Sequence, residues 1–144
     1  MNHLKFHTDK LRASGLRPTK QRLAICKILF NRKETFHFTI DQLQKIAEKN
    51  VKKKFSLATL YNTIHAFEKK GYLKEISLKG NKTFFDTNIK SHHHFYDEEK
   101  SQLTDIKNEN ISINNIPNIP NGKKIQDIEV IIKIASNNQK QKNN

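Results

Sequence analysis

Apolar residues in the N-terminal half recur every three or four positions, the spacing that gives an α-helix one buried face. Residues 3–15 predict a first short helix, which ends at the cap residue Gly15. Its expected buried face is Leu4, His7 or Thr8, and Leu11. A second helix follows Pro18 and Thr19, with an apolar stripe of Leu23, Cys26, Leu29 and Phe30.

Two later helices are indicated by the residues that cap them. Thr39 and Gln42 form a capping box, in which each side chain accepts a hydrogen bond from the backbone N–H of the other residue. Ser56 is a suitable N-cap for a fourth helix, which Gly71 ends. The expected buried face of the third helix is Leu43, Ile46 and Ala47.

After Gly71 the apolar residues alternate with polar ones, which is typical of β-strands. Ile76 and Leu78 form the first strand, Gly80-Asn81 predicts a two-residue hairpin turn, and residues 83–85 continue as the second strand. A hairpin directly after three or four helices predicts a winged helix-turn-helix domain.

The remaining residues predict a second, smaller unit of short strands. Strands are expected at 92–96, 103–106 and 111–113, and the prolines at 117 and 120 break any helix after them. Strict alternation over 128–134 predicts a last strand with one apolar face. So few strands cannot bury that face alone, so we expect it to pair with a second copy of the chain. The polar tail 136–144 is expected to be disordered.

The charge of the chain narrows the class of partner. The 144 residues include 27 Lys and Arg against 14 Asp and Glu, a formal net charge of +13. This surplus favours a polyanion such as nucleic acid, although an AT-rich genome also raises lysine content whatever the function. No apolar run approaches the roughly 20 residues that span a bilayer, so we expect a cytoplasmic protein outside the membrane. The single cysteine, Cys26, is expected to be buried and excludes a disulfide or a cysteine-based zinc site within one chain.

The fourth predicted helix has an apolar and a polar arc. The apolar arc is Leu57, Leu60, Ile64 and Phe67, and the polar arc is Ala58, Asn62, His65 and Lys69, with Tyr61 at the boundary. Asn pairs with adenine and Ala or Tyr contacts thymine methyl groups, so this arc favours an A·T-rich major groove, with an ordinary solvated face as the alternative. The expected DNA-binding set is Arg17, Lys20, Arg22, Ser56, Ala58, Thr59, Tyr61, Asn62, His65 and Lys69.

A histidine triplet is the densest chemical signal in the sequence. In an extended strand His92 and His94 point to one side and His93 to the other, so two imidazoles can meet one cation. Asp86 and Asp105 lie beside predicted strands and can add carboxylate oxygens. This set of donors suits Fe(II), Mn(II), Co(II) or Zn(II), whereas a triplet taken alone is often a surface tract that binds metal adventitiously.

In their order along the chain, these features resemble the ferric uptake regulator family over residues 10–135. The resemblance is carried by Gly15-Leu16-Arg17-Pro18-Thr19-Lys20-Gln21-Arg22, His37-Phe38-Thr39, Ser56-Leu57-Ala58-Thr59-Leu60-Tyr61-Asn62-Thr63, Phe85-Asp86-Thr87 and His92-His93-His94. It implies an α+β fold, with a winged-helix DNA-binding domain at 1–88 and a small α/β dimerisation and sensing domain at 89–135. It also implies a homodimeric repressor that binds double-stranded DNA.

The same resemblance implies a regulatory metal site at the hinge between the two domains. The positions that match the family's ligands are His37, Asp86, His92, His94 and Asp105. The implied ion is Fe(II), with Zn(II) or Mn(II) as alternatives. A ligand set from both domains would stabilise one orientation of the two DNA readers, and so one spacing of half-sites.

The chain also departs from the family pattern. Many members hold a structural zinc with two Cys-x-x-Cys pairs, the first starting where Asp97 stands here, and this chain has neither pair. Residues 116–122 replace a helix, and Asn62 replaces an arginine typical of the iron-uptake branch. Together with the His-His-His-Phe-Tyr stretch, these changes look most like the iron response regulator branch, which acts on iron and haem metabolism. That likeness adds a haem hypothesis, with ligands His92, His93 and His94.

Three other functions compete with this interpretation. The five candidate ligands also resemble the iron site of peroxide sensors, in which oxidation of a ligand histidine releases DNA. A metalloenzyme is disfavoured because the sequence, with four glycines, lacks a nucleophile elbow and a phosphate-cradling loop, so we expect no enzyme. A basic RNA-associated protein is disfavoured because no aromatic stacking motif lies on a strand.

Overall fold

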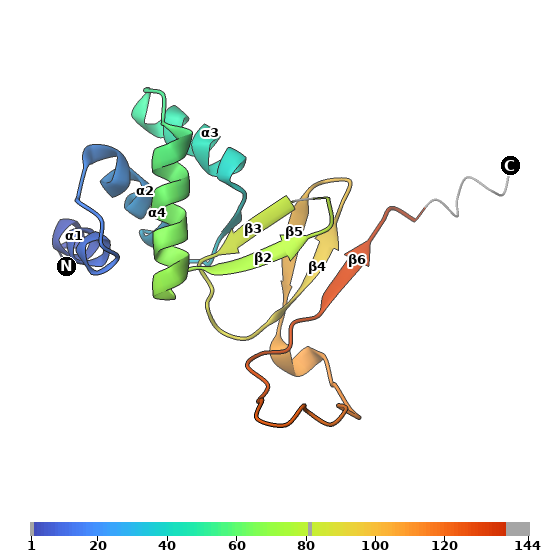
Figure 1. The fold of residues 1–144 in the computed structure, drawn as a ribbon. Helices are drawn as coiled ribbons and strands as arrows, with labels where there is room; N and C mark the ends of the chain where they lie inside the picture. Colours follow the sequence, from blue (N-terminus) through green and yellow to red (C-terminus); the bar gives the residue numbers. More distant parts are fainter. Residues whose placement is uncertain (1, 81, 138–144) are drawn as a thin grey trace, which may run out of the picture. The chain divides into compact units, whose positions relative to one another are not determined.

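The protein divides into two compact units, Met1–Ile89 and Lys90–Asn144, in a computed structural model that describes residues 2–80 and 82–137 (Figure 1). Each unit contains its own three-stranded sheet. Within the described residues, no helix is both long enough and apolar enough to cross a membrane. The tail predicted to be disordered lies outside the described residues from position 138 onward.

The first unit contains the four predicted helices. They are α1 (His3–Ala13), α2 (Lys20–Phe30), α3 (Ile40–Val51) and α4 (Leu57–Lys70). The capping box is present at the start of α3, where Thr39 N–H donates to Gln42 Oε1 at 3.0 Å and Gln42 N–H donates to Thr39 Oγ1 at 3.2 Å. Gly71 ends α4 with a φ of 87°, a left-handed conformation that side chains with a Cβ rarely adopt.

The helices of the first unit pack around one apolar core. Its largest fully buried side chains include Phe38, Phe67, Phe85, Leu11, Ile25, Leu43, Leu60 and Ile64. Cys26 lies in this core as predicted, and its burial raises the pKa of its thiol to about 12. The thiol is therefore a small apolar group rather than a nucleophile.

Two leucines predicted to be buried are exposed. Leu4 and Leu57 lie in the first turns of their helices, which extend past the core, and they are 61% and 46% exposed. On α4 Thr63, which the predicted apolar arc did not include, is fully buried, and its hydroxyl donates to the Thr59 carbonyl at 2.7 Å. This local hydrogen bond satisfies the hydroxyl and allows a polar residue to occupy the core.

The wing is an antiparallel sheet of strand order β1-β3-β2, formed by β1 (His37–Phe38), β2 (Lys74–Leu78) and β3 (Lys82–Asp86). The predicted two-residue turn is wrong in length, because Leu78 pairs with Lys82 and three positions lie between them. Gly80 has a φ of 79°, and Asn81 lies outside the described residues. A two-residue turn at Gly80-Asn81 would require Lys79 to pair with Lys82, whereas the observed register pairs Leu78 with Lys82.

The second unit has the strand order β5-β4-β6. Its strands are β4 (His93–Asp97), β5 (Gln102–Ile106) and β6 (Ile131–Ile134), with β4 antiparallel to β5 and parallel to β6. A 3-10 turn, η1 (Asn108–Asn110), is the one helical element among its described residues. The strand predicted at 111–113 is wrong, because no neighbouring strand pairs with it, and β6 is shorter than the predicted 128–134.

The attachment of α1 to the core depends on a buried histidine. His7 is 1% exposed, and its Nε2–H donates to Asn31 Oδ1 at 3.0 Å. Its Nδ1 is buried and makes no hydrogen bond within the described residues. Burial lowers the pKa of His7 below 6.5; repulsion from His3, Lys10 and Lys27 acts in the same direction, and the Asn31 bond opposes them.

A pH dependence of stability follows from this environment. Because the pKa of His7 is lower in the folded chain, the unfolded chain binds more protons below pH 6.5, so stability is lost as pH falls from there toward the folded pKa. We expect the free energy of unfolding of wild type minus that of His7→Phe to decrease on acidification, with a slope of at most about 1.4 kcal/mol per pH unit. Urea unfolding between neutral pH and pH 5 measures it, and a difference that is constant with pH would contradict it.

Candidate metal centre and nucleic-acid interface

The wing of the first unit holds a histidine beside a buried aspartate. His37 and Asp86 are paired residues of β1 and β3, and His37 Nε2 lies 3.5 Å from Asp86 Oδ2. Asp86 is fully buried, and its other oxygen accepts a hydrogen bond from the Asn88 N–H at 2.8 Å. The strand ends are tied together because Phe36 N–H donates to Thr87 Oγ1 at 2.9 Å. The pair is therefore held by backbone pairing as well as by its own contact.

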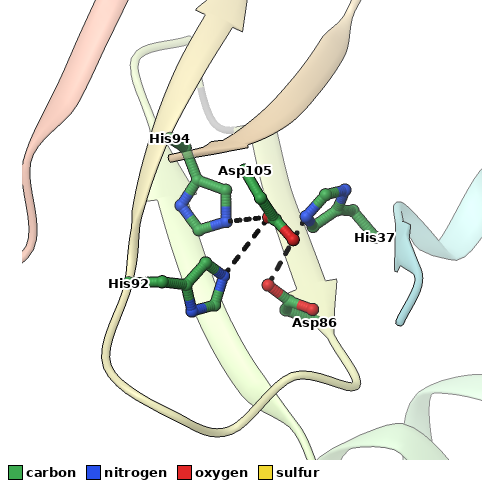
Figure 2. Close-up of side chains that lie close together, drawn as sticks. All are labelled: His37, Asp86, His92, His94 and Asp105. Atoms are coloured by element: carbon green, nitrogen blue, oxygen red, sulfur yellow. Dashed lines mark ion pairs between the residues drawn. The ribbon is translucent and has the colours of Figure 1, made fainter. Parts of the chain in front are cut away.

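The second unit holds two histidines around one aspartate. His94 is paired with Asp105 across β4 and β5, and His94 Nε2 lies 3.2 Å from Asp105 Oδ1. His92 Nε2 lies 3.3 Å from the same oxygen, and the two imidazole centres are 4.4 Å apart. Figure 2 shows these three residues and the His37–Asp86 pair, with the contacts within each group as dashed lines.

The tautomer of His92 follows from its backbone contact. Its Nδ1 lies 2.7 Å from the Lys90 carbonyl oxygen, which can only accept, so Nδ1 carries the proton. Its Nε2 then faces Asp105. His94 has an analogous neighbour, because its Nδ1 lies 3.3 Å from Glu129 Oε1. Sequence reasoning did not single out Glu129 as a neighbour of the candidate ligands.

His93 has a different environment from the other two histidines. Its Nδ1 accepts a hydrogen bond from the Val130 N–H at 2.9 Å, and its ring lines a hollow of about 350 Å³ with Ser91, Asn108 and several isoleucines. His92 and His94 instead approach Asp105. The hypothesis that all three histidines ligate one haem therefore finds no support in these contacts, because one imidazole nitrogen of His93 is already used by the backbone.

Chemically, each group offers part of a metal donor set. The first group offers an imidazole and a carboxylate, and the second offers two imidazoles and a carboxylate. Neutral imidazole and carboxylate oxygen without thiolate form a donor set for Fe(II), Mn(II) or Zn(II). The buried positions of Asp86, His92 and His94 favour a specific role over an adventitious surface tract.

The polar arc of α4 is available to a partner. Of the residues predicted to read DNA, those exposed on this helix are Ala58, Tyr61, Asn62, His65 and Lys69. The Tyr61 ring stacks on His65 with centroids 5.8 Å apart, which orders the two aromatic groups next to Asn62. Ser56 is also exposed, but its hydroxyl oxygen accepts from Thr59 N–H and caps the helix.

Basic residues of α2 meet the start of α4 at one surface hollow. Lys20, Arg22 and Thr59 line it together with Thr19 and Gln21, and its volume is about 390 Å³. The guanidinium of Arg22 donates to the Arg17 carbonyl at 2.9 Å, which orients Arg22 along the loop before α2. The structure thus brings three predicted phosphate or base contacts to one place. Backbone N–H groups at the start of α2 add to the attraction for an anion.

A family model described as the ferric uptake regulator family matches residues 13–133. The chain belongs to the ferric uptake regulator family. The match covers both units and agrees with the resemblance seen in the sequence.

Known relatives and solved structures agree with this family membership. The chain is 30% identical over 106 residues to the peroxide-responsive repressor PerR of Staphylococcus aureus, covering 74% of this chain and 70% of that protein. Its fold is similar to that of the Vibrio cholerae ferric uptake regulator, with a TM-score of 0.65, 17% identity, and coverage of 90% of this chain and 98% of that one. The Campylobacter jejuni peroxide stress regulator gives a TM-score of 0.56 at 20% identity, covering 96% and 99%.

The predicted fold class, an α+β chain with an N-terminal winged helix and a smaller second domain, is confirmed by these similarities. Assignment to the iron response regulator branch rests on the sequence resemblance alone and stays a prediction. Membership of the ferric uptake regulator family does not select among its effectors.

Proposed function

We propose that this member of the ferric uptake regulator family is a homodimeric transcriptional regulator whose affinity for DNA responds to a divalent metal ion. The observation that carries the proposal is the presence of a His–carboxylate group in each unit, on the two sides of the short connection between them. Such a protein acts by binding and release of DNA and not as an enzyme.

The two groups together form the proposed metal site. Alone, neither reaches the four donors of a closed site, and together they supply His37, Asp86, His92, His94 and Asp105. Asp86 and His92 are six positions apart in the sequence, a length of chain that spans at most about 20 Å. The connection therefore limits the separation of Asp86 and His92 to about 20 Å, which allows the two groups to meet at one ion.

Fe(II) is the proposed ion, with Zn(II) and Mn(II) as alternatives, because a mixed imidazole and carboxylate shell accepts all three. When bound, the ion supplies the attraction that ties donors of both units to one point. His92 and the wing pair His37–Asp86 are then coupled, and one relative orientation of the units becomes more populated. That orientation sets the spacing of the two DNA readers in a dimer.

The proposed DNA contacts are of two kinds. Asn62, Tyr61 and Ala58 on α4 suit the edges of A·T base pairs in the major groove. Arg17, Lys20, Arg22 and Lys69 suit backbone phosphates, and the formal net charge of +13 favours association with a polyanion.

The second unit is proposed to pair with its copy. Its described part has three strands, and Ile132 and Ile134 on β6 remain 38% and 42% exposed. A sheet this small is stable only when its apolar side chains are covered. A second copy of the chain covers them and also places two α4 helices in one complex.

Loss of the central histidines tests the metal site. We expect His94→Ala to weaken Co(II) or Mn(II) binding by more than about 100-fold, beyond the effect typical of outer-sphere partners, because a buried donor is removed. His3→Ala, a change at an exposed histidine of α1, is the matched control and should leave the affinity unchanged. Metal titration measures the affinity of each variant, and its far-UV circular dichroism spectrum shows whether it is folded, so loss of a ligand is distinguished from unfolding. Unchanged metal affinity in folded His94→Ala would sink the assignment.

Substitutions on α4 and α2 test the DNA reader. The test uses duplexes that the metal-loaded protein selects from a random library. On the best of these sequences, Asn62→Ala should lose about 1–3 kcal/mol of binding free energy and weaken the base preference at one position. Lys20→Ala should weaken binding to all sequences by the same factor. It should also reduce the slope of log affinity against log salt concentration by about one unit. Fluorescence anisotropy at several salt concentrations measures both effects. Equal behaviour of the two variants would exclude α4 as the base-reading element.

Peroxide sensing is a second candidate function, favoured by the 30% identity with a peroxide-responsive repressor. Loaded with Fe(II) and exposed to hydrogen peroxide, such a sensor gains one oxygen atom on a ligand histidine and releases its DNA. Peptide mass spectrometry should then find the modified residue at His37 or His92, and the Mn(II)-loaded protein should stay unmodified. If the Fe(II)-loaded protein stays unmodified after exposure to hydrogen peroxide and still binds DNA, the protein senses metal and does not sense peroxide.

A further inference from the structure

We infer that Glu129 is a positioning residue for the proposed metal site, whose carboxylate accepts the Nδ1 proton of His94 and so presents the Nε2 lone pair to the cation. The inference deepens the proposed function and rests on it for the role of the cation. The preference for one tautomer of His94 is a property of the protein without metal and can be measured separately.

The contact lies in a buried part of the second unit. His94 is fully buried, and its Nδ1 lies 3.3 Å from Glu129 Oε1. That oxygen is itself buried and accepts no well-aligned hydrogen bond within the described residues. A buried carboxylate oxygen is costly without a donor, and the ring N–H of His94 is the group beside it. The two atoms lie within hydrogen-bonding distance without the alignment of a hydrogen bond, and the Asp105 carboxylate that faces Nε2 is 38% exposed, so water can donate to Asp105 whereas the buried Glu129 oxygen has His94 as its neighbouring donor.

Glu129 lies on the opposite side of the imidazole from the proposed ligands. Nδ1 faces Glu129, whereas Nε2 is 3.2 Å from Asp105 Oδ1. Because the two ring nitrogens point in divergent directions, Glu129 and Asp105 cannot ligate the same cation through the position that Nε2 faces. Glu129 therefore acts on the site through His94 and not as a ligand.

The neighbouring histidine uses the same arrangement with a different acceptor. His92 Nδ1–H donates to the Lys90 carbonyl at 2.7 Å, and His92 Nε2 approaches Asp105 at 3.3 Å. In both imidazoles an oxygen atom lies near Nδ1 and the Asp105 carboxylate lies near Nε2. Metal-binding histidines generally donate the other ring N–H to a carboxylate or a carbonyl, which fixes the tautomer and the ring orientation.

Strand pairing brings Glu129 to this place. His94 N–H donates to the Val130 carbonyl at 3.1 Å, and Val130 N–H donates to His93 Nδ1 at 2.9 Å. His94 is the register partner of Ile131 in the parallel pair of β4 and β6. The segment before β6 is thereby held against the histidines, so the tautomer of His94 depends on the docking of the C-terminal strand.

The test compares three variants of the full chain. Glu129→Leu removes the acceptor at similar size, Glu129→Gln keeps an acceptor oxygen without the charge, and Asp127→Asn removes a charge two residues away at a carboxylate that contacts Ser91 instead. The first readout is the long-range 1H–15N spectrum of the histidine rings without metal at pH 8. We expect His94 to be in the Nδ1–H tautomer in wild type, Asp127→Asn and Glu129→Gln, and to shift toward Nε2–H in Glu129→Leu.

The second readout is Co(II) affinity, followed by the visible absorption of the ion. Glu129→Leu should bind about 10- to 100-fold more weakly, Glu129→Gln should recover most of the affinity, and Asp127→Asn should match wild type. Backbone amide spectra check that each variant is folded. The tautomer of His94 in the wild-type protein is measured without any variant, so it tests the inference even if Glu129→Leu fails to fold.

Two results would overturn the inference. One is an Nε2–H tautomer of His94 in the wild-type protein, and the other is a folded Glu129→Leu with wild-type tautomer and Co(II) affinity. Failure of the proposed function looks different. In that event wild type binds no Co(II), while His94 still shows its tautomer preference and loses it in Glu129→Leu.

Discussion

Antiparallel strand pairing holds the candidate ligands of both units in place. In the wing, β1 and β3 set His37 opposite Asp86, and in the second unit β4 and β5 set His94 opposite Asp105. Directly opposed residues have Cβ atoms about 4.5–5.5 Å apart, close enough for an imidazole and a carboxylate to meet. The ladder hydrogen bonds thus set the ligand geometry, and a slip of one residue would turn each side chain to the other face.

The two units rely on different sources of stability around these pairs. In the first unit one apolar cluster joins the four helices to the wing residues Phe38 and Phe85, and Phe85 is the neighbour of Asp86. In the second unit the buried residues near the site include three histidines, and much of the isoleucine content stays exposed. Polar contacts such as Val130 N–H to His93 therefore carry more of its organisation. Such a unit is well suited to being stabilised by a cation or by a second subunit.

The difference between the two units suggests how an ion could regulate DNA binding in the proposed function. In the proposed regulator the first unit presents α4, with Asn62 and Tyr61 exposed, and the second unit contributes the histidines that would respond to the ion. In this proposal the short connection after Asp86 would couple the units, because a ligand that prefers one orientation of them shifts the population toward it. Under the proposed function, affinity for DNA would then depend on the cation without direct contact between the cation and the bases.

The sequence by itself determined the features that arise from local spacing and local chemistry. The four helices with their caps and the strands of the wing follow from residues near one another in the chain, because helical and strand periods and capping bonds are local, and the order of these motifs indicated the family. The local pattern failed for Leu57 and for the strand expected at 111–113, because burial and pairing require a partner surface. Only the tertiary structure decided that Glu129 lies beside His94 Nδ1, and that His7 rather than Thr8 is buried on the first helix while Leu4 is exposed, since these outcomes depend on contacts between segments far apart in sequence.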